Sequence, residues 1–161
     1  MHTRRTSSVQ GWNELAPYKL TTMKITIERL DDAFHLRASN TQGNSVETDA
    51  NPDIGGHGLG MRPMEMLISS LGTCSSIDVI HILRKQRQPL DDIKVEISAE
   101  REKDKQPALF SDIHVSFHLY GAVDPDKVER AVNLSMGKYC SVTRIVEKTA
   151  HITWDWTIHP A

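Results

Sequence analysis

Apolar and polar residues alternate along much of this chain, which is the pattern of β-strands with one buried face. Near the start, two alternating runs are separated by Asp31 and Asp32, a pair typical of a turn. A third strand is expected just after them, and three longer alternating runs follow in the second half. The predicted strands are residues 24–28, 34–38, 45–48, 93–100, 112–119 and 152–158.

Between the two groups of strands the period changes to that of a helix. Residues 63–87 form the longest helical pattern, with Pro63 at the favourable first turn and basic residues over 84–87 at the end. The segment is apolar on nearly every side and contains Gly72 and several serines. This composition predicts a central helix buried all round, whose small residues let another element approach its backbone.

A second helix is predicted after Asp124 and Pro125, which suit an N-cap and a first helical position. Its apolar face extends from Val128 to a point near Cys140, and residues 142–147 predict a further short helix. The expected order is therefore βββ-α-ββ-α-β, an α+β domain with antiparallel sheets around two central helices.

A single domain is expected over residues 24–161, since 161 residues suffice to bury one core. Residues 1–23 are polar and aperiodic and are expected to be a loosely ordered N-terminal extension. Residues 51–60 hold four glycines and a proline, which indicates a loop rather than a phosphate-binding motif.

Composition narrows the possible functions. The formal charge of −2, from 19 basic and 21 acidic residues, gives no electrostatic basis for nucleic-acid binding. No run of about 18 apolar residues is present, so no membrane span is expected. Two cysteines are too few for a secreted disulfide scaffold. We therefore expect a cytoplasmic protein.

The two cysteines, Cys74 and Cys140, are the main candidates for chemistry. They lie 66 residues apart in helix-like segments, which excludes a CxxC motif and a local zinc knuckle. If the fold brought them together, they could cycle between dithiol and disulfide. The alternative is that both are inert thiols of the core.

Other polar residues are placed around Cys74 by helical geometry. At about 100° per residue, Asp78 and His81 lie on the face of Cys74, one and two turns beyond it. A histidine or a hydrogen-bonded network there could tune the thiolate, the reactive form of cysteine. Alternatively, His81 only marks the approach of the helix to solvent. Glu65 falls on the opposite side, where Arg62 could pair with it.

A metal site is not expected from the histidines. His114 and His118 are four residues apart in a predicted strand, where both face the polar side. No third ligand lies near them in the sequence, and zinc sites need at least three protein ligands.

Two stretches of the sequence surround the cysteines. One is Pro63-Met64-Glu65-Met66-Leu67 followed by Leu71-Gly72-Thr73-Cys74-Ser75-Ser76-Ile77-Asp78-Val79, and the other is Lys138-Tyr139-Cys140-Ser141. Together they resemble the OsmC/Ohr family, the osmotically inducible and organic hydroperoxide resistance proteins. The proline eleven residues before the first cysteine and the wide cysteine spacing are the most specific features. The resemblance covers about residues 24–160.

The resemblance implies an intertwined homodimer with two active sites at the subunit interface. It implies that Cys74 attacks the O–O bond of an organic hydroperoxide as a thiolate, leaving a sulfenic acid. Cys140 would then resolve the sulfenic acid as an intramolecular disulfide, which a dithiol reduces. No metal or organic cofactor is implied. The biological role would be that of an antioxidant oxidoreductase in a stress response.

The sequence also departs from the family pattern. Well-studied members place a glutamate directly after the helix-opening proline, paired with an arginine that activates the thiol. Here that position is Met64 and the carboxylate follows at Glu65. The arginine candidates are Arg29, Arg37 and Arg62, of which Arg62 is favoured, and Ser141 replaces the usual proline after the second cysteine. These differences indicate a divergent branch.

Two further functions stay open at this point. In the first, the protein binds an apolar or acyl ligand in a cavity at the dimer interface, without catalysis. Met61, Met64 and Met66 support this reading, since methionines form adaptable apolar walls. In the second, the protein is a thiol redox sensor, which would form a disulfide without multiple turnovers.

Overall fold

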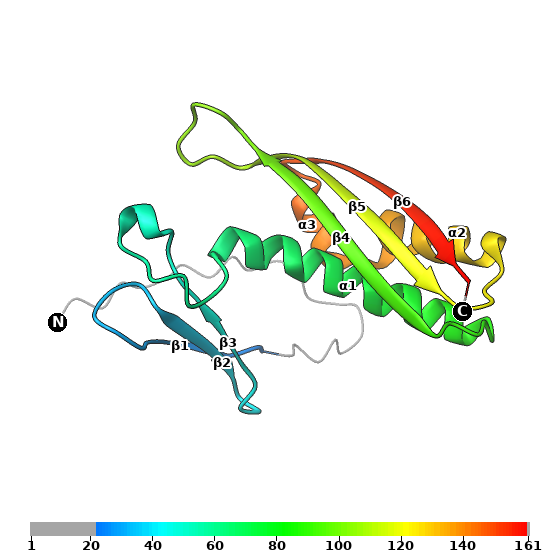
Figure 1. Cartoon of the computed structure of the whole chain (residues 1–161), viewed down its shortest axis with the longest axis horizontal. Helices are drawn as coiled ribbons and strands as arrows, with labels where there is room; N and C mark the ends of the chain where they lie inside the picture. Colours follow the sequence, from blue (N-terminus) through cyan, green and yellow to red (C-terminus); the bar gives the residue numbers. More distant parts are fainter. Residues whose placement is uncertain (1–21, 161) are drawn as a thin grey trace, which may run out of the picture.

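The computed structural model describes residues 22–160, in which a long helix lies between two three-stranded sheets (Figure 1). Most of the proposed N-terminal extension lies outside the described residues. The elements in chain order are β1 (Ile25–Arg29), β2 (Leu36–Asn40), β3 (Ser45–Thr48), the 3-10 turn η1 (Pro52–Ile54), α1 (Pro63–Lys85), β4 (Asp92–Arg101), β5 (Phe110–Tyr120), α2 (Pro125–Leu134), the π-helical turn η2 (Ser135–Tyr139), α3 (Ser141–Val146) and β6 (His151–His159). The α+β class and the predicted order are confirmed.

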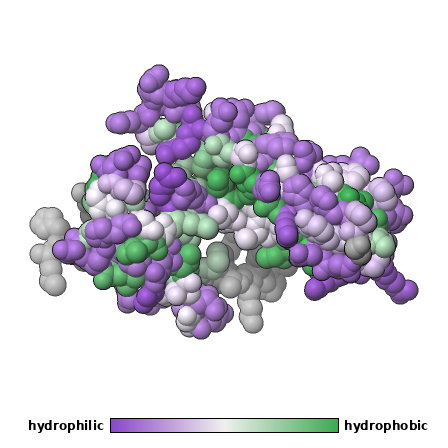
Figure 2. Space-filling view, in the orientation of Figure 1, coloured by the Kyte–Doolittle hydropathy of each residue, from purple (hydrophilic) through white to green (hydrophobic). Residues whose placement is uncertain are grey.

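The N-terminal sheet has the order β1-β2-β3, with both pairs antiparallel. Its register aligns Ile27 with Ala38 and Ala38 with Val46, which gathers apolar side chains on one face. That face is open, because Ile25, Ile27 and Val46 are 58%, 65% and 41% exposed. Apolar surface shows on this part of the molecule in Figure 2. An alternating strand pattern predicts that one face of the sheet is buried. Because the apolar face of this sheet is exposed, the described chain does not supply the surface that would bury it.

The second sheet has the order β4-β5-β6 and forms one wall of the core. Strands β4 and β5 are antiparallel, but β6 runs parallel to β5. The expectation of wholly antiparallel sheets is therefore wrong for this strand. The reason is the connection: α2, η2 and α3 carry the chain back across the sheet, so that β6 enters in the same direction as β5.

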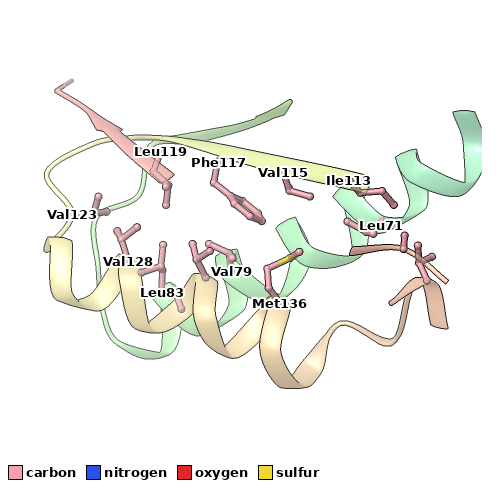
Figure 3. Close-up of a cluster of buried hydrophobic side chains, with 14 of the residues drawn as sticks. Leu71, Val79, Leu83, Ile113, Val115, Phe117, Leu119, Val123, Val128 and Met136 are labelled. Atoms are coloured by element: carbon pink, nitrogen blue, oxygen red, sulfur yellow. The ribbon is translucent and has the colours of Figure 1, made fainter. Parts of the chain in front are cut away.

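The core lies between this sheet and the helices. Phe117 and its neighbours on β5 point toward Val79 and Leu83 of α1 and toward Val128 and Met136 of the α2–η2 segment (Figure 3). All of these side chains are fully buried. Burial of each of these side chains stabilises the fold by about 1.5–3 kcal/mol through the hydrophobic effect. The core between the second sheet and the helices therefore supplies most of the stability of the fold.

Helix α1 differs from its prediction in one respect. Only Leu71, Gly72, Ser75, Val79 and Leu83 are buried, along one stripe. Elsewhere apolar side chains face outward, with Leu67 37% and Ile77 66% exposed. The prediction of a helix buried all round is thus wrong within the single chain. Hydrophobicity shows that a face needs a partner but cannot show whether the same chain provides it.

By length and composition alone, α1 could cross a membrane, contrary to the expectation from the sequence. The same test is passed by the core helix of a globular protein. Here α1 packs closely on β4, since a Cβ atom added at Gly72 would lie only 2.7 Å from Ile97 Cδ1. This contact is the close approach that the small residues of the helix predict.

Candidate functional site

The two cysteines meet where α1 packs against the segment that joins α2 to α3. The Sγ atoms of Cys74 and Cys140 and a carboxylate oxygen of Asp78 all lie within 4.8 Å of one another. Both cysteines are free thiols. Residues 66 positions apart are therefore brought to a separation that a small movement could close to a disulfide.

The environments of the two thiols differ. Cys74 lies in the middle of α1 and is partly exposed, whereas Cys140 is completely buried. Cys140 caps α3, where the backbone N–H of Thr143 donates a hydrogen bond to its Sγ at 3.5 Å. One thiol can thus meet a molecule arriving from outside, and the other can meet only Cys74 and its surroundings.

Burial raises the pKa of the Cys140 thiol, and the nearby Cys74 adds to the rise, while the hydrogen bond from Thr143 opposes it. The Cys140 S–H group is directed to the Leu71 carbonyl oxygen at 3.9 Å. Cys140 is therefore held in its protonated form at neutral pH, which suits a second nucleophile better than a first one.

Asp78 lies one helical turn beyond Cys74, on the face that the sequence predicts. The hydroxyl group of the buried Ser135 lies 3.2 Å from Asp78 Oδ2 and 3.2 Å from the Ser75 carbonyl oxygen. Ser135 therefore ties the Asp78 side chain to η2. His81 is exposed and lines, together with Asp78, a cavity of about 610 Å³ between α1 and α2.

Arg62 and Glu65 form an ion pair at the start of α1, as the sequence suggests. Arg62 Nε donates to Glu65 Oε1 at 2.9 Å, and Glu65 also accepts the backbone N–H of Arg62. The Arg62 guanidinium holds the pKa of Glu65 below its usual range. Of the other arginine candidates, Arg37 is paired with Glu47 at 2.7 Å.

The ion pair does not reach Cys74 within one chain. Glu65 precedes Cys74 by nine residues, which at ~1.5 Å per residue separates them by about 13 Å along the helix axis. Glu65 also points to the opposite side of α1. The candidate residues thus fall into two groups, one around the cysteines and one at the helix start.

The loop before α1 is held in place by a buried carboxylate. Asp49 is 2% exposed and accepts hydrogen bonds from the backbone N–H groups of Ala50, His57 and Leu59. These bonds lower the pKa of Asp49, that from Leu59 most strongly. The glycine-rich loop is thus fixed to β3, and it in turn fixes the start of α1.

The Arg62–Glu65 pair borders a cavity between the start of α1 and the strands β2 and β4. The cavity has a volume of about 730 Å³ and is mainly apolar. Of the three methionines singled out from the sequence, only Met64 lines it. Its other lining residues include Phe34, Leu36, Ile54, Ile68, Ile97 and Phe110.

Sequence reasoning missed the parts that Ser135 and Thr143 play. Both are buried polar residues, and each contacts a member of the cysteine cluster through one hydrogen bond. Their position in a helical pattern predicts only that they pack inward. For Ser135 the signal that could have flagged it is a hydroxyl group on a helix face that is otherwise apolar, since buried hydroxyl groups need partners. Thr143 acts through its backbone N–H group, which no side-chain pattern reveals.

Residues 56–155 match the family model described as OsmC-like protein, which is more than half of the chain. This chain belongs to the OsmC-like family. The resemblance to the OsmC/Ohr proteins is thereby confirmed. Among curated relatives of this family, protein YhfA of Escherichia coli strain K12 is 42% identical over 97 residues, which cover 60% of this chain and 72% of YhfA.

Solved structures agree with the family. A hypothetical protein from Aquifex aeolicus is 30% identical and matches with a TM-score of 0.71, over 87% of this chain and 99% of its own. An organic hydroperoxide resistance protein OsmC from Legionella pneumophila is 13% identical with a TM-score of 0.65, covering 86% and 98% of the two chains. The second similarity shows the OsmC-like fold alone.

Proposed function

We propose that this OsmC-like protein reduces organic hydroperoxides through Cys74 and Cys140. The observation that carries the proposal is the pairing of a partly exposed thiol with a buried one, whose sulfur atoms lie within 4.8 Å. The family supports a redox role, and one structural relative is described as an organic hydroperoxide resistance protein.

In the first step the Cys74 thiolate attacks the terminal oxygen of the hydroperoxide, the one that carries the hydrogen. The O–O bond breaks, the sulfur is oxidised to a sulfenic acid, and the released alkoxide takes a proton to leave as an alcohol. Leu67 and Ile77, seven residues before and three residues after Cys74 on α1, are both exposed. An alkyl tail placed on this surface would gain roughly 0.8 kcal/mol per buried CH₂ group, which favours organic hydroperoxides over hydrogen peroxide.

In the second step the Cys140 sulfur attacks the sulfenic sulfur of Cys74. The S–S bond forms, and the sulfenic hydroxyl group leaves with the Cys140 proton as water. A dithiol then reduces the disulfide by exchange, which restores both thiols. Asp78 and His81 complete the proposal as tuning residues. A carboxylate beside two thiols disfavours more negative charge, and His81, one helical turn beyond Asp78, would act through that carboxylate.

The same proposal includes a homodimer, the usual assembly of OsmC-like proteins. The exposed apolar stripe of α1 and the open face of the N-terminal sheet both need a cover. A second copy would cover them and could bring its own Arg62–Glu65 pair to Cys74, which the pair of the same chain cannot reach.

A thiol count tests this function directly. Reduced protein mixed with one equivalent of cumene hydroperoxide should lose both thiols per chain and yield one equivalent of alcohol. Mass spectrometry should find a Cys74–Cys140 disulfide within a chain. Thiols that persist through excess hydroperoxide would contradict the proposal.

The rate of disulfide closure should rise with pH. Because the pKa of Cys140 is raised, its thiolate fraction at neutral pH lies below that of a free thiol and increases about tenfold per pH unit up to the pKa. The increase should therefore continue above about pH 8.5, where an unperturbed thiol is half ionised. Rapid-quench thiol counts after a single oxidation measure this rate. A profile that levels off well below pH 8.5 would contradict Cys140 as the resolving thiol.

Binding without catalysis is the second candidate, and the apolar cavity of about 730 Å³ favours it. Its apolar lining would suit an acyl chain, and the cavity lies at the start of α1, away from the cysteines. Lipid that copurifies with a protein whose thiols resist hydroperoxide would establish this function. A disulfide that forms once but is not turned over by dithiols would instead identify a redox sensor.

A further inference from the structure

We infer that the reduced site also binds one soft divalent cation of the zinc type, through Cys74, Asp78 and Cys140. The sequence alone predicts no metal site, since its histidines lack a third partner. The fold brings Cys140 next to Cys74 and Asp78, although Cys140 lies far from both in the sequence. This inference needs only the reduced side chains and does not rest on peroxide chemistry.

The donor atoms suit such an ion. Two cysteine sulfurs, which bind metals as thiolates, and one carboxylate oxygen lie within 4.8 Å of one another, and this trio is the one cluster of its kind among residues 22–160. Zinc binds sulfur at about 2.3 Å and carboxylate oxygen at roughly 2.1 Å, so its tetrahedral ligands lie about 3.5–3.8 Å apart. The three groups need to close by only about 1 Å to reach that spacing.

The backbone fixes the three groups in a chelating arrangement. Cys74 and Asp78 are four residues apart on α1, the spacing at which two ligands share one helix face in zinc enzymes. Cys140 comes from the cap of α3, on the far side of the gap. Two ligands from one helix and a third from another segment are a common way to hold a metal ion in a fixed geometry.

The surroundings of the ligands support an ion as well. Ser135 lies 3.2 Å from Asp78 Oδ2, and the N–H of Thr143 donates to Cys140 Sγ. Hydrogen bonds to ligating atoms orient the ligands of metal sites and strengthen them. Two sulfurs and a carboxylate gathered in a half-buried site also repel one another once ionised, and a divalent cation removes that repulsion.

Three protein ligands leave a fourth position of the ion open. Cys74 and Asp78 are both partly exposed, so this position faces outward, where water or a small thiol can fill it. A bound ion would occupy the sulfur lone pairs that attack hydroperoxide. The metal-bound form would therefore be a protected, inactive reserve of the reduced protein.

Cobalt and zinc titrations test the site. Full-length protein is freed of any affinity tag, reduced under anaerobic conditions and dialysed against a chelator before Co²⁺ is added. One ion per chain is expected, with the intense near-ultraviolet absorption of cobalt–thiolate bonds, and Zn²⁺ should displace it. Protein oxidised to the disulfide should not bind.

Variants separate the ligands from their support. Cys74→Ser and Cys140→Ser should abolish the thiolate absorption or halve it, and Asp78→Asn should weaken binding by at least about 100-fold while keeping the size of the side chain. Ser135→Ala should weaken binding about 10- to 100-fold. The matched control is His118→Ala with His159→Ala, which removes a histidine pair 3.1 Å apart on the outer face of the second sheet. That control should bind as the unmodified protein does.

Three results would overturn the inference: no ion bound, an ion whose affinity is unchanged by Asp78→Asn, or an ion lost with the histidine pair. None of them bears on the proposed function, because hydroperoxide reduction is measured in the presence of a chelator. Conversely, an inert pair of thiols that still binds one cobalt ion would contradict the peroxidase and leave the metal site standing.

Discussion

Replacing Cys74 with serine should lower the rate of organic hydroperoxide reduction by at least ~10³-fold, to the rate of the protein-free reaction. The hydroxyl group of serine is not ionised at neutral pH and cannot accept the peroxide oxygen as a thiolate does. Cys74 is the one of the two thiols that solvent reaches. The measurement is alcohol production from cumene hydroperoxide with excess dithiol, and unchanged turnover in Cys74→Ser would remove this residue from the mechanism.

Replacing Cys140 with serine should have a different signature. The variant should consume one equivalent of hydroperoxide as quickly as the unmodified protein and then stop as a sulfenic acid, which a dimedone-type reagent traps. Cys140 is fully buried beside Cys74, so its loss removes the resolving thiol but not the attacking one. A Cys140→Ser variant that continues to turn over at the original rate would show that an external thiol resolves Cys74 directly.

The second large effect concerns Arg62. Arg62→Ala should lower turnover by about 100-fold, because a guanidinium near the thiolate stabilises the charge that builds up on the departing oxygen. Glu65 holds this guanidinium through the ion pair at the helix start. Since the pair cannot reach Cys74 of its own chain, the effect should act between subunits.

Mixed dimers test that arrangement. Two chains with different tags are expressed together, one carrying Cys74→Ser and the other Arg62→Ala. The purified mixed dimer should regain about half of the normal activity, since one of its two sites combines an intact Cys74 with an intact Arg62 from the other chain. The matched control carries both changes on one chain and none on the other, and it should be nearly inactive.

The opposite pattern would contradict the assignment. If the control kept half of the activity and the first mixed dimer had none, Arg62 would act on the Cys74 of its own chain. About half of the normal activity in both mixed dimers would remove Arg62 from the mechanism but leave the chemistry of the cysteines intact, since each dimer has one intact Cys74.

Local sequence patterns were sufficient to predict the helices and strands of the fold. Alternation places all six strands close to their observed bounds, and Pro63 and Pro125 mark the first residues of α1 and α2. Such signals lie within a few residues of one another, and the side-chain period follows from backbone geometry. These local signals could not predict the direction of β6, because that direction depends on how far the crossover through α2, η2 and α3 carries the chain.

The contacts of the candidate site also divide into those that a local pattern predicts and those that it does not. The sequence by itself determined that Asp78 shares a helix face with Cys74 and that Arg62 can pair with Glu65, because these are contacts within one helix. Only the tertiary structure decided that Cys140 lies beside Cys74 and that Ser135 ties Asp78 to η2. It alone also decided that apolar residues of α1 such as Leu67 and Ile77 stay exposed within the described chain. Contacts between distant segments depend on the packing of the whole core, which no local period encodes.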